Sequence, residues 1–335
     1  MNIKTALVGL SVLAAAVIVY AFISGEISEN AAVRDSAPLS VGTNIWPGYE
    51  PLYLARELGY YDNNKVRLVE FASTTQVIHA FRNRVISAAA LTLDEVLLLK
   101  DYGLDPKVIL IFDISEGADV ILARKEIPNM RALKGKKVGV ENTALGAFVL
   151  MRSLQLHNMT LSDISVVSLP INEHDSAFDK GKIDALITFE PVRSRLLAKG
   201  YHEIFTSREM PGEIVDVLVV NKETLVSQQD QIDALLQGWF RANSYFQVNP
   251  NKAAKVMAGR QKISAAEVLD SYAGLHLPGL SETLTLMSGP NPPFESTARR
   301  LADTMFASKL LNNKPDLELL VDAGPLERAA RPEQR

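Results

Sequence analysis

The stretch from Val41 to Tyr61 reads VGTNIWPGYEPLYLARELGYY. It opens inside a β-type run, Ser40–Ile45, which is bounded by turn residues and predicts a strand. A Pro-Gly loop follows, and Glu50–Leu58 then carries apolar residues at three- and four-residue spacing, as in an amphipathic helix. A strand, a loop and a helix in this order indicate an α/β fold.

The same alternation of strand-type and helix-type runs continues to about Lys222, beyond which the chain is predicted to be almost wholly helical. Alternation of this kind favours parallel sheets with helical crossovers. The expected strands are Ser40–Ile45, Val66–Phe71, Lys107–Asp113, Asp119–Ala123, Lys137–Val140, Ile164–Leu169, Ala185–Phe189 and Val215–Val220. The expected helices are Glu50–Leu58, Thr74–Asn83, Leu93–Tyr102, Leu145–Leu156, Ser176–Lys180 and Val192–Lys199.

Two breaks in the pattern predict two α/β lobes joined by two crossings of the chain. One break lies near Ile114–Asp119 and the other near Met210–Asp216. Ligands of open α/β sheets bind outside the carboxyl ends of the strands, so the cleft between the lobes is the expected binding site. The predicted organisation is a signal peptide or membrane anchor over 1–25, a linker over 26–38, lobe 1 over 39–115 plus 217–325, lobe 2 over 116–216 and a tail over 326–335.

Composition excludes several classes of function. The chain has 335 residues, enough for about two domains, and 35 Lys+Arg against 39 Asp+Glu, a net charge of -4 that argues against a nucleic-acid surface. The absence of Cys excludes disulfides, a thiolate nucleophile and thiolate metal sites. The five His residues have no metal-like spacing, and no catalytic triad order or phosphate loop occurs. No metal site, cofactor or catalytic residue is predicted.

The amino terminus contains a run suited to lipid. Lys4 precedes the uncharged apolar run Ala6–Ile23, whose length of about 18 residues nearly matches a bilayer core. Bulky Phe22 and Ile23 stand where a cleavage site usually has small residues, which favours an uncleaved anchor over a cleaved signal peptide. Both readings export the chain from about residue 26 to the periplasm, soluble or anchored to the inner membrane through residues 6–23; a buried helix of the fold is the third alternative.

The order of several segments resembles a known family. The opening Val41–Tyr61, the hydroxyl-rich Ser73-Thr74-Thr75, the run Leu133–Val140 and the stretch from Asp184 to Pro191 occur in the order seen in solute-binding proteins of the nitrate/sulfonate/taurine transporter family. That family includes sulfonate-binding and thiamine-pyrimidine-precursor-binding (THI5-like) relatives. The resemblance covers roughly Leu39 to Lys222 and implies a bilobal type II periplasmic-binding-protein fold with a helical C-terminal segment.

The resemblance also implies which residues face the ligand. They lie in loops that follow strands, or where helices begin. The implied ligand-binding residues are Asn44, Trp46, Tyr49, Ser73, Thr74, Thr92, Asn142, Thr143, Gly146, Glu190 and Asp216.

The residue chemistry of two predicted helix starts is consistent with this assignment. Ser73 and Thr74 stand before one helix, and Asn142–Gly146 stands before another. Hydroxyl side chains at such positions cap free backbone N–H groups, which is the ordinary structural role. The same N–H groups and the helix dipole can instead hold an anion or a ligand carboxylate.

The aromatic and acidic candidates each have a structural alternative. Trp46 and Tyr49 could stack on a planar or cationic ligand, or Trp46 could pack beneath the loop as part of the core. Glu190 follows a strand directly and would also suit a helix dipole as a first-turn acid. Asp216 interrupts an apolar run and needs a partner, either a ligand amine or a base such as Arg124 or Arg193. If both acids face the cleft, the solute carries an amino or cationic group beside any anionic one.

Three functions are therefore in competition. The first is an exported, non-enzymatic protein that closes on a small amine-, sulfonate- or pyrimidine-like solute and delivers it to an ABC permease. The second is a membrane-anchored ligand sensor of the same fold that signals to a membrane partner. The third is a pyrimidine-synthase-like enzyme, which the absence of a catalytic constellation disfavours.

Overall fold

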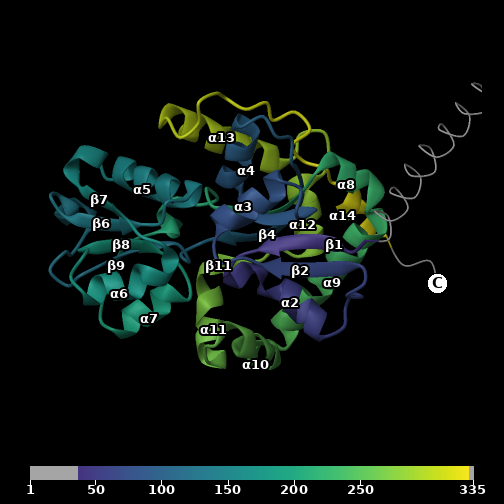
Figure 1. The fold of residues 1–335 in the computed structure, drawn as a ribbon, viewed down its shortest axis with the longest axis horizontal. Coiled ribbons are helices and arrows are strands. Elements are labelled where there is room, and N and C mark those ends of the chain that lie inside the picture. Colours follow the sequence, from purple (N-terminus) through teal and green to yellow (C-terminus); the bar gives the residue numbers. More distant parts are fainter. Residues whose placement is uncertain (1–36, 332–335) are drawn as a thin grey trace, which may run out of the picture. The chain divides into compact units, whose positions relative to one another are not determined.

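The computed structural model describes residues 37–331, in which Leu39 begins a compact unit built on two β-sheets (Figure 1). The expectations for a signal peptide or anchor over 1–25, and for most of the linker over 26–38, lie outside the described residues. Among the helices of residues 37–331, none combines the length and apolar character needed to cross a bilayer.

Within the described residues, the first sheet has six strands and forms the centre of lobe 1. Its neighbouring strands, in spatial order, are β11 (Leu275–His276), β4 (Lys107–Ser115), β10 (Val215–Val220), β3 (Ala88–Thr92), β1 (Leu39–Thr43) and β2 (Val66–Glu70). The second sheet forms the centre of lobe 2, and its strands in order are β7 (Ser165–Ser168), β6 (Lys137–Val140), β8 (Ala185–Thr188), β5 (Val120–Ala123) and β9 (His202–Thr206).

Both sheets are mixed: β1 runs parallel to β2 and β3, and β6 runs parallel to β7 and β8, as expected, but the expectation was wrong for the remaining strands. In lobe 1, β10 runs antiparallel to both β3 and β4, and β11 runs antiparallel to β4. In lobe 2, β5 runs antiparallel to β8 and β9. The reason is the pair of crossings: β5 and β10 receive the chain directly from the other lobe, without a helical crossover that would return it in the same direction.

Helices cover the sheets of both lobes. In lobe 1, α3 and α4 pack against β3, while α9 contacts α2, α10 and α14. The helices of the first lobe are α2 (Glu50–Glu57), α3 (Thr74–Arg82), α4 (Leu93–Asp101), α8 (Lys222–Ser227), α9 (Gln229–Val248), α10 (Pro250–Gln261), α11 (Ala265–Ser271), α12 (Leu280–Met287), α13 (Pro293–Ala307) and α14 (Gly324–Ala329). Those of the second are α5 (Ala144–Leu156), α6 (His174–Asp179) and α7 (Val192–Ala198).

The chain passes between the sheets at two places. The first passage joins β4 to β5 through residues 116–119, and the second joins β9 to β10 through residues 207–214. Because Val215 and Asp216 already pair with β4, the first sheet begins two residues ahead of the lobe boundary expected at 216. The tail expected from 326 begins inside α14, which packs on α9 and β4.

Helices α4 and α5 contact each other, as do α7 and α11, so the two lobes touch through both pairs of helices. The large apolar side chain of Trp239 is fully buried in α9 and packs edge-on against Phe112 of β4, as expected for a core residue. The sheets therefore provide rigid supports for the loops that face each other between the lobes.

Candidate functional site

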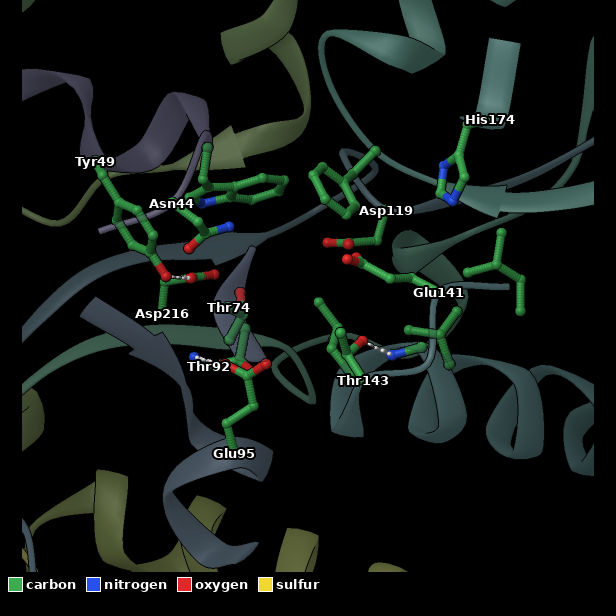
Figure 2. Close-up of a pocket in the computed structure, with 16 residues that line it drawn as sticks. Asn44, Tyr49, Thr74, Thr92, Glu95, Asp119, Glu141, Thr143, His174 and Asp216 are labelled. Atoms are coloured by element: carbon green, nitrogen blue, oxygen red, sulfur yellow. Dashed lines mark hydrogen bonds between the residues drawn. The ribbon is translucent and has the colours of Figure 1, made fainter. Parts of the chain in front are cut away.

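Strand ends from both sheets meet at one cavity. In lobe 1 the carboxyl ends of β1 and β3 lead to Asn44 and Thr92, and in lobe 2 those of β6 and β8 lead to Glu141 and Phe189. The central cavity contains about 600 Å³ of space between protein atoms, part of which is open to solvent, and Figure 2 shows the side chains around it. It is lined by Asn44, Trp46, Tyr49, Thr74, Thr92, Glu95, Asp119, Glu141, Thr143, Leu145, Gly146, Val149, His174, Ile187, Phe189 and Asp216.

The cavity brings together most of the residues that the sequence singled out. Ser73 lies instead at the mouth, a wider adjoining pocket that shares Asn44, Thr74, Glu141 and Phe189 with the central cavity. Asn142 is exposed and lies outside both linings. The predicted residues in the central lining are Asn44, Trp46, Tyr49, Thr74, Thr92, Thr143, Gly146 and Asp216.

Glu190 is buried but is absent from the lining of the cavity and of its mouth. One carboxylate oxygen accepts from Arg193 Nη1 at 2.8 Å and from Ser194 Oγ at 3.0 Å, and the other accepts from the Ser194 backbone N–H at 3.2 Å. The structure thus gives Glu190 the helix-start role that was its structural alternative, with both oxygens bound by the protein.

Trp46 has both of its alternative roles. Its indole Nε1 donates to Asp113 Oδ2 at 3.1 Å, and its ring is almost fully buried at 5% exposure. The ring also lines the cavity and contacts Phe189 of lobe 2 edge-on, with 5.6 Å between the ring centroids. Trp46 therefore provides a fixed aromatic surface between the lobes.

Asp216 lies at the amino end of β10, where the strand register pairs it with Thr92 on one side and Asp113 on the other. The partner of its carboxyl Oδ1 is the Tyr49 hydroxyl, which donates a hydrogen bond to it. Neither Arg124 nor Arg193 is that partner: Arg124 donates to backbone carbonyls, and Arg193 binds Glu190 and Glu203. The other carboxyl oxygen, Oδ2, is buried and has no hydrogen-bond partner among residues 37–331.

Four titratable lining residues were missed from the sequence, and three of them are acids. Glu95 lies in the first turn of α4, where its carboxylate accepts from the Thr92 backbone N–H at 3.0 Å. Asp119 precedes β5 and Glu141 follows β6. The fourth, His174, is fully buried at the start of α6. The signal available for the acids was their position at strand or helix ends beside apolar runs.

Burial dominates the electrostatics of these groups. It raises the pKa of Asp119 to about 6 and also raises the pKa of Glu141. For Asp216 and Glu95, burial followed by the field of neighbouring carboxylates (Asp113 for Asp216, Asp94 for Glu95) raises each pKa well above its usual value. Burial lowers the pKa of His174 to about 4, so its imidazole is neutral at pH 7.

Two helix starts face the cavity, as expected. Thr143 Oγ1 accepts from the Gly146 N–H at 3.0 Å at the start of α5, and Thr74 is the first residue of α3. A side chain at position 146 would meet the backbone oxygen of Glu141, so glycine lets this helix start lie close to the strand end. Within residues 37–331, no group of three acidic or histidine side chains is arranged to hold a metal ion.

Comparison with known proteins places this geometry in a family. The profile of the NMT1-like family matches residues 33–260. The chain belongs to the NMT1-like family. The resemblance to solute-binding proteins of the nitrate/sulfonate/taurine group is thereby confirmed. A Bacillus subtilis (strain 168) protein described as an aliphatic sulfonates-binding protein is 26% identical over 253 residues, which are 67% of this chain and 75% of the relative.

Solved structures show the same fold. The alkanesulfonate-binding protein SsuA from Xanthomonas axonopodis pv. citri, bound to MOPS, superposes with a TM-score of 0.71 at 17% identity, covering 85% of this chain and 98% of that one. The desulfurization enzyme DSZB superposes with a TM-score of 0.65 at 14% identity, covering 88% of this chain and 98% of that one. The bilobal type II periplasmic-binding-protein fold is thus confirmed, and it is shared by binding proteins and an enzyme.

Proposed function

We propose that this chain is an exported solute-binding protein, which closes its two lobes on a small organic solute and presents it to an ABC permease. The observation that carries the proposal is the central cavity, because its walls come from the strand ends of both lobes (Figure 2). A solute that contacts both walls binds the closed form more tightly than the open one and so drives closure.

The relatives support this proposal. The Bacillus subtilis relative is described as binding aliphatic sulfonates, and the SsuA proteins are named for the same class of ligand. The Escherichia coli SsuA is described as periplasmic, which favours the same location here, with the apolar run 6–23 as a signal peptide or inner-membrane anchor. We propose binding without turnover, although DSZB demonstrates that an enzyme can share the fold.

Native mass spectrometry of the full chain, purified in a mild detergent, tests the proposal. A co-purified small molecule that is released unchanged on unfolding is the expected result. Recovery of a chemically altered molecule after prolonged incubation would instead identify an enzyme. A chain that carries nothing and binds no member of a metabolite pool would contradict a solute-binding role.

A further inference from the structure

The central cavity has acidic groups on both of its walls. Asp216 and Glu95 belong to lobe 1, while Asp119 and Glu141 stand on the side of lobe 2 (Figure 2). Within the described part of the chain, no lysine or arginine lines this cavity. Arg195, Arg260 and Lys262 line the adjoining pocket at the mouth instead.

Several buried acceptors in the cavity have no partner. Asp216 Oδ2 and Asp119 Oδ2 find no hydrogen-bond donor among residues 37–331, although these side chains are only 2% and 3% exposed. The same is true of Asn44 Oδ1. Leaving a buried polar group unpaired is destabilising, so these acceptors favour a ligand that supplies several N–H donors.

The helix starts at the cavity do not reverse this charge. Each helix amino terminus is equivalent to about half a positive charge, and α3 and α5 together supply roughly one. Four carboxyl groups face them. The balance leaves an excess of negative charge once the acids are ionised, while the two helix starts remain available for an anionic or polar end of the same solute.

The remaining walls favour an organic cation over a metal ion. Trp46, Tyr49 and Phe189 give the cavity aromatic surfaces, which attract ammonium and amidinium groups through their ring faces. As described above, residues 37–331 provide no metal-binding group of acids and histidines, and His174 faces the cavity as a neutral imidazole.

We infer that the solute carries a compact organic cation, an ammonium or amidinium-type group, which is held between carboxylates of the two lobes. This inference rests on the proposed function and names the chemical class of its solute. The cation also makes closure depend on the ligand: without it, closing the lobes brings like charges together in a dry cavity, and with it the same charges attract a common partner.

The inference predicts the sign of the pH dependence. A cation stabilises the ionised acids, so its affinity should rise between pH 6 and pH 8, by up to tenfold per pH unit for each proton displaced. An anion bound by protonated acids would show the opposite trend. Eight titratable groups from both lobes influence one another in and beside the cavity. The acids are Asp94 and Glu95 on α4, Asp113 on β4, Asp119 in the first passage, Glu141 after β6 and Asp216 on β10. The other two are Tyr49, in the 3₁₀ turn Pro47–Tyr49, and His174 on α6.

Matched pairs of probes test the charge of the solute by isothermal titration calorimetry on the full chain. The pairs are guanidinium and urea, methylammonium and methanol, benzylammonium and benzyl alcohol, and 2-aminoethanesulfonate and ethanesulfonate. At least one cation is expected to bind tenfold or more tightly than its partner without the positive charge, with affinity rising from pH 6 to pH 8.

Glu141→Gln tests the site itself. Glu141 is half-buried, whereas the other three acids are buried, so its substitution is the least disruptive to folding. The cation that binds best should lose ten- to a hundredfold in affinity, whereas the exposed Glu126→Gln in the same lobe should leave it unchanged. Unaltered binding by Glu141→Gln and Asp119→Asn would overturn the inference, as would failure of every cation to bind.

The outcomes distinguish a failure of this inference from a failure of the proposed solute-binding function. If ethanesulfonate or a neutral probe binds as tightly as its cationic partner, the protein remains a solute-binding protein and only the cation assignment is wrong. If no probe binds and no small molecule co-purifies, both fail together.

Discussion

Asp216 illustrates how a single residue can be anticipated while its partner is not. An acid inside the apolar run of β10 had to be paired, and the pairing comes from the Tyr49 hydroxyl on one oxygen. The second oxygen is buried and has no donor among the residues that the structure describes, and the side chain lines the cavity. A buried carboxyl with an unpaired oxygen is destabilising, and a ligand that donates a hydrogen bond to that oxygen removes this cost.

Asp216→Asn should therefore weaken ligand binding more than it weakens the fold. The amide oxygen can still accept from Tyr49, but the negative charge is lost. We expect the best-binding cation to lose about ten- to a hundredfold in affinity, equivalent to about 1.5–3 kcal/mol. Calorimetry measures the affinity, with exposed Asp270→Asn as the matched control. Parental affinity in the Asp216 variant would make this residue structural.

Asp113 is a second buried acid: one oxygen accepts from Trp46, and the other has no partner within residues 37–331. Burial is the main cause that raises its pKa to about 8. Its folded form therefore binds a proton more tightly than its unfolded form, whose pKa is near 4. The stabilisation by this proton is fully present below about pH 4 and is lost as the pH rises to about 8.

Asp113→Asn should accordingly flatten the pH dependence of stability. Urea unfolding of the ligand-free chain at pH 5, 7 and 9 measures the free energy of unfolding. The unfolding free energy of the parent should fall across this range, and that of the variant should fall less. The two slopes of unfolding free energy against pH should differ by at most the contribution of one titrating proton. Parallel slopes for parent and variant would show that Asp113 does not titrate in this range.

Among the elements, those with a strong periodic pattern were predictable. Strands β6 and β10 have the expected bounds, and α2 and α4 begin where expected. Three strands were missed: β3 consists mainly of alanine, β9 contains charged residues, and β11 has two residues within a helical region. Their strand conformation comes from pairing with neighbours in the sheet, which a local pattern does not encode.

The cavity was predictable to a similar degree. Residues at strand ends, such as Asn44 and Thr143, followed from the resemblance and from the topology. Asp119 and Glu141 were missed because their importance depends on the two lobes facing each other, and Glu190 was misplaced because only the structure shows its partners Arg193 and Ser194. The roles of these three acids depend on contacts between residues far apart in the sequence or on side-chain geometry, which a local sequence pattern does not show.

A close approach of backbones holds the first passage between the lobes against lobe 1. Gly274, in the 3₁₀ turn Tyr272–Gly274, accepts from the Glu116 N–H at 2.8 Å. A Cβ atom at position 274 would lie 2.6 Å from the backbone nitrogen of Ala118 and 2.7 Å from the carbonyl carbon of Gly117. Because both contacts are with backbone, the neighbouring chain has little freedom to move away.

Gly274→Ala should destabilise the protein by about 1–3 kcal/mol, the usual effect of overpacking. Gly259→Ala is the control, since a Cβ there meets no atom within 4 Å and lies inside α10. Alanine has a higher helix propensity, so this variant should be more stable by about 1 kcal/mol. Equal midpoints in thermal unfolding for the two variants would contradict a tight contact at the passage.

At the scale of the whole molecule, the distribution of charge couples the two lobes. The net charge of the chain is only -4, yet four carboxyl groups face one cavity. The lobes also touch through α4 with α5 and through α7 with α11. The balance between open and closed forms then depends on how many of the cavity's acids are ionised and on whether a cation lies among them.

This coupling can be measured as a change in distance between the lobes. The chain has no cysteine, so cysteines introduced at exposed Val85 in lobe 1 and Leu161 in lobe 2 are the sole labelling sites for a fluorescent donor and acceptor. Without ligand, energy-transfer efficiency should differ between pH 5, where the raised pKa values keep the acids protonated, and pH 9, where ionised carboxylates repel each other. Adding the best-binding cation at pH 9 should reverse the difference, because it neutralises the charge that holds the lobes apart.

Two labels within lobe 1, at Val85 and Val226, provide the control and should report no change. If the energy-transfer efficiency between the lobes changes neither with pH nor on addition of the cation, the charge of the cavity does not govern closure.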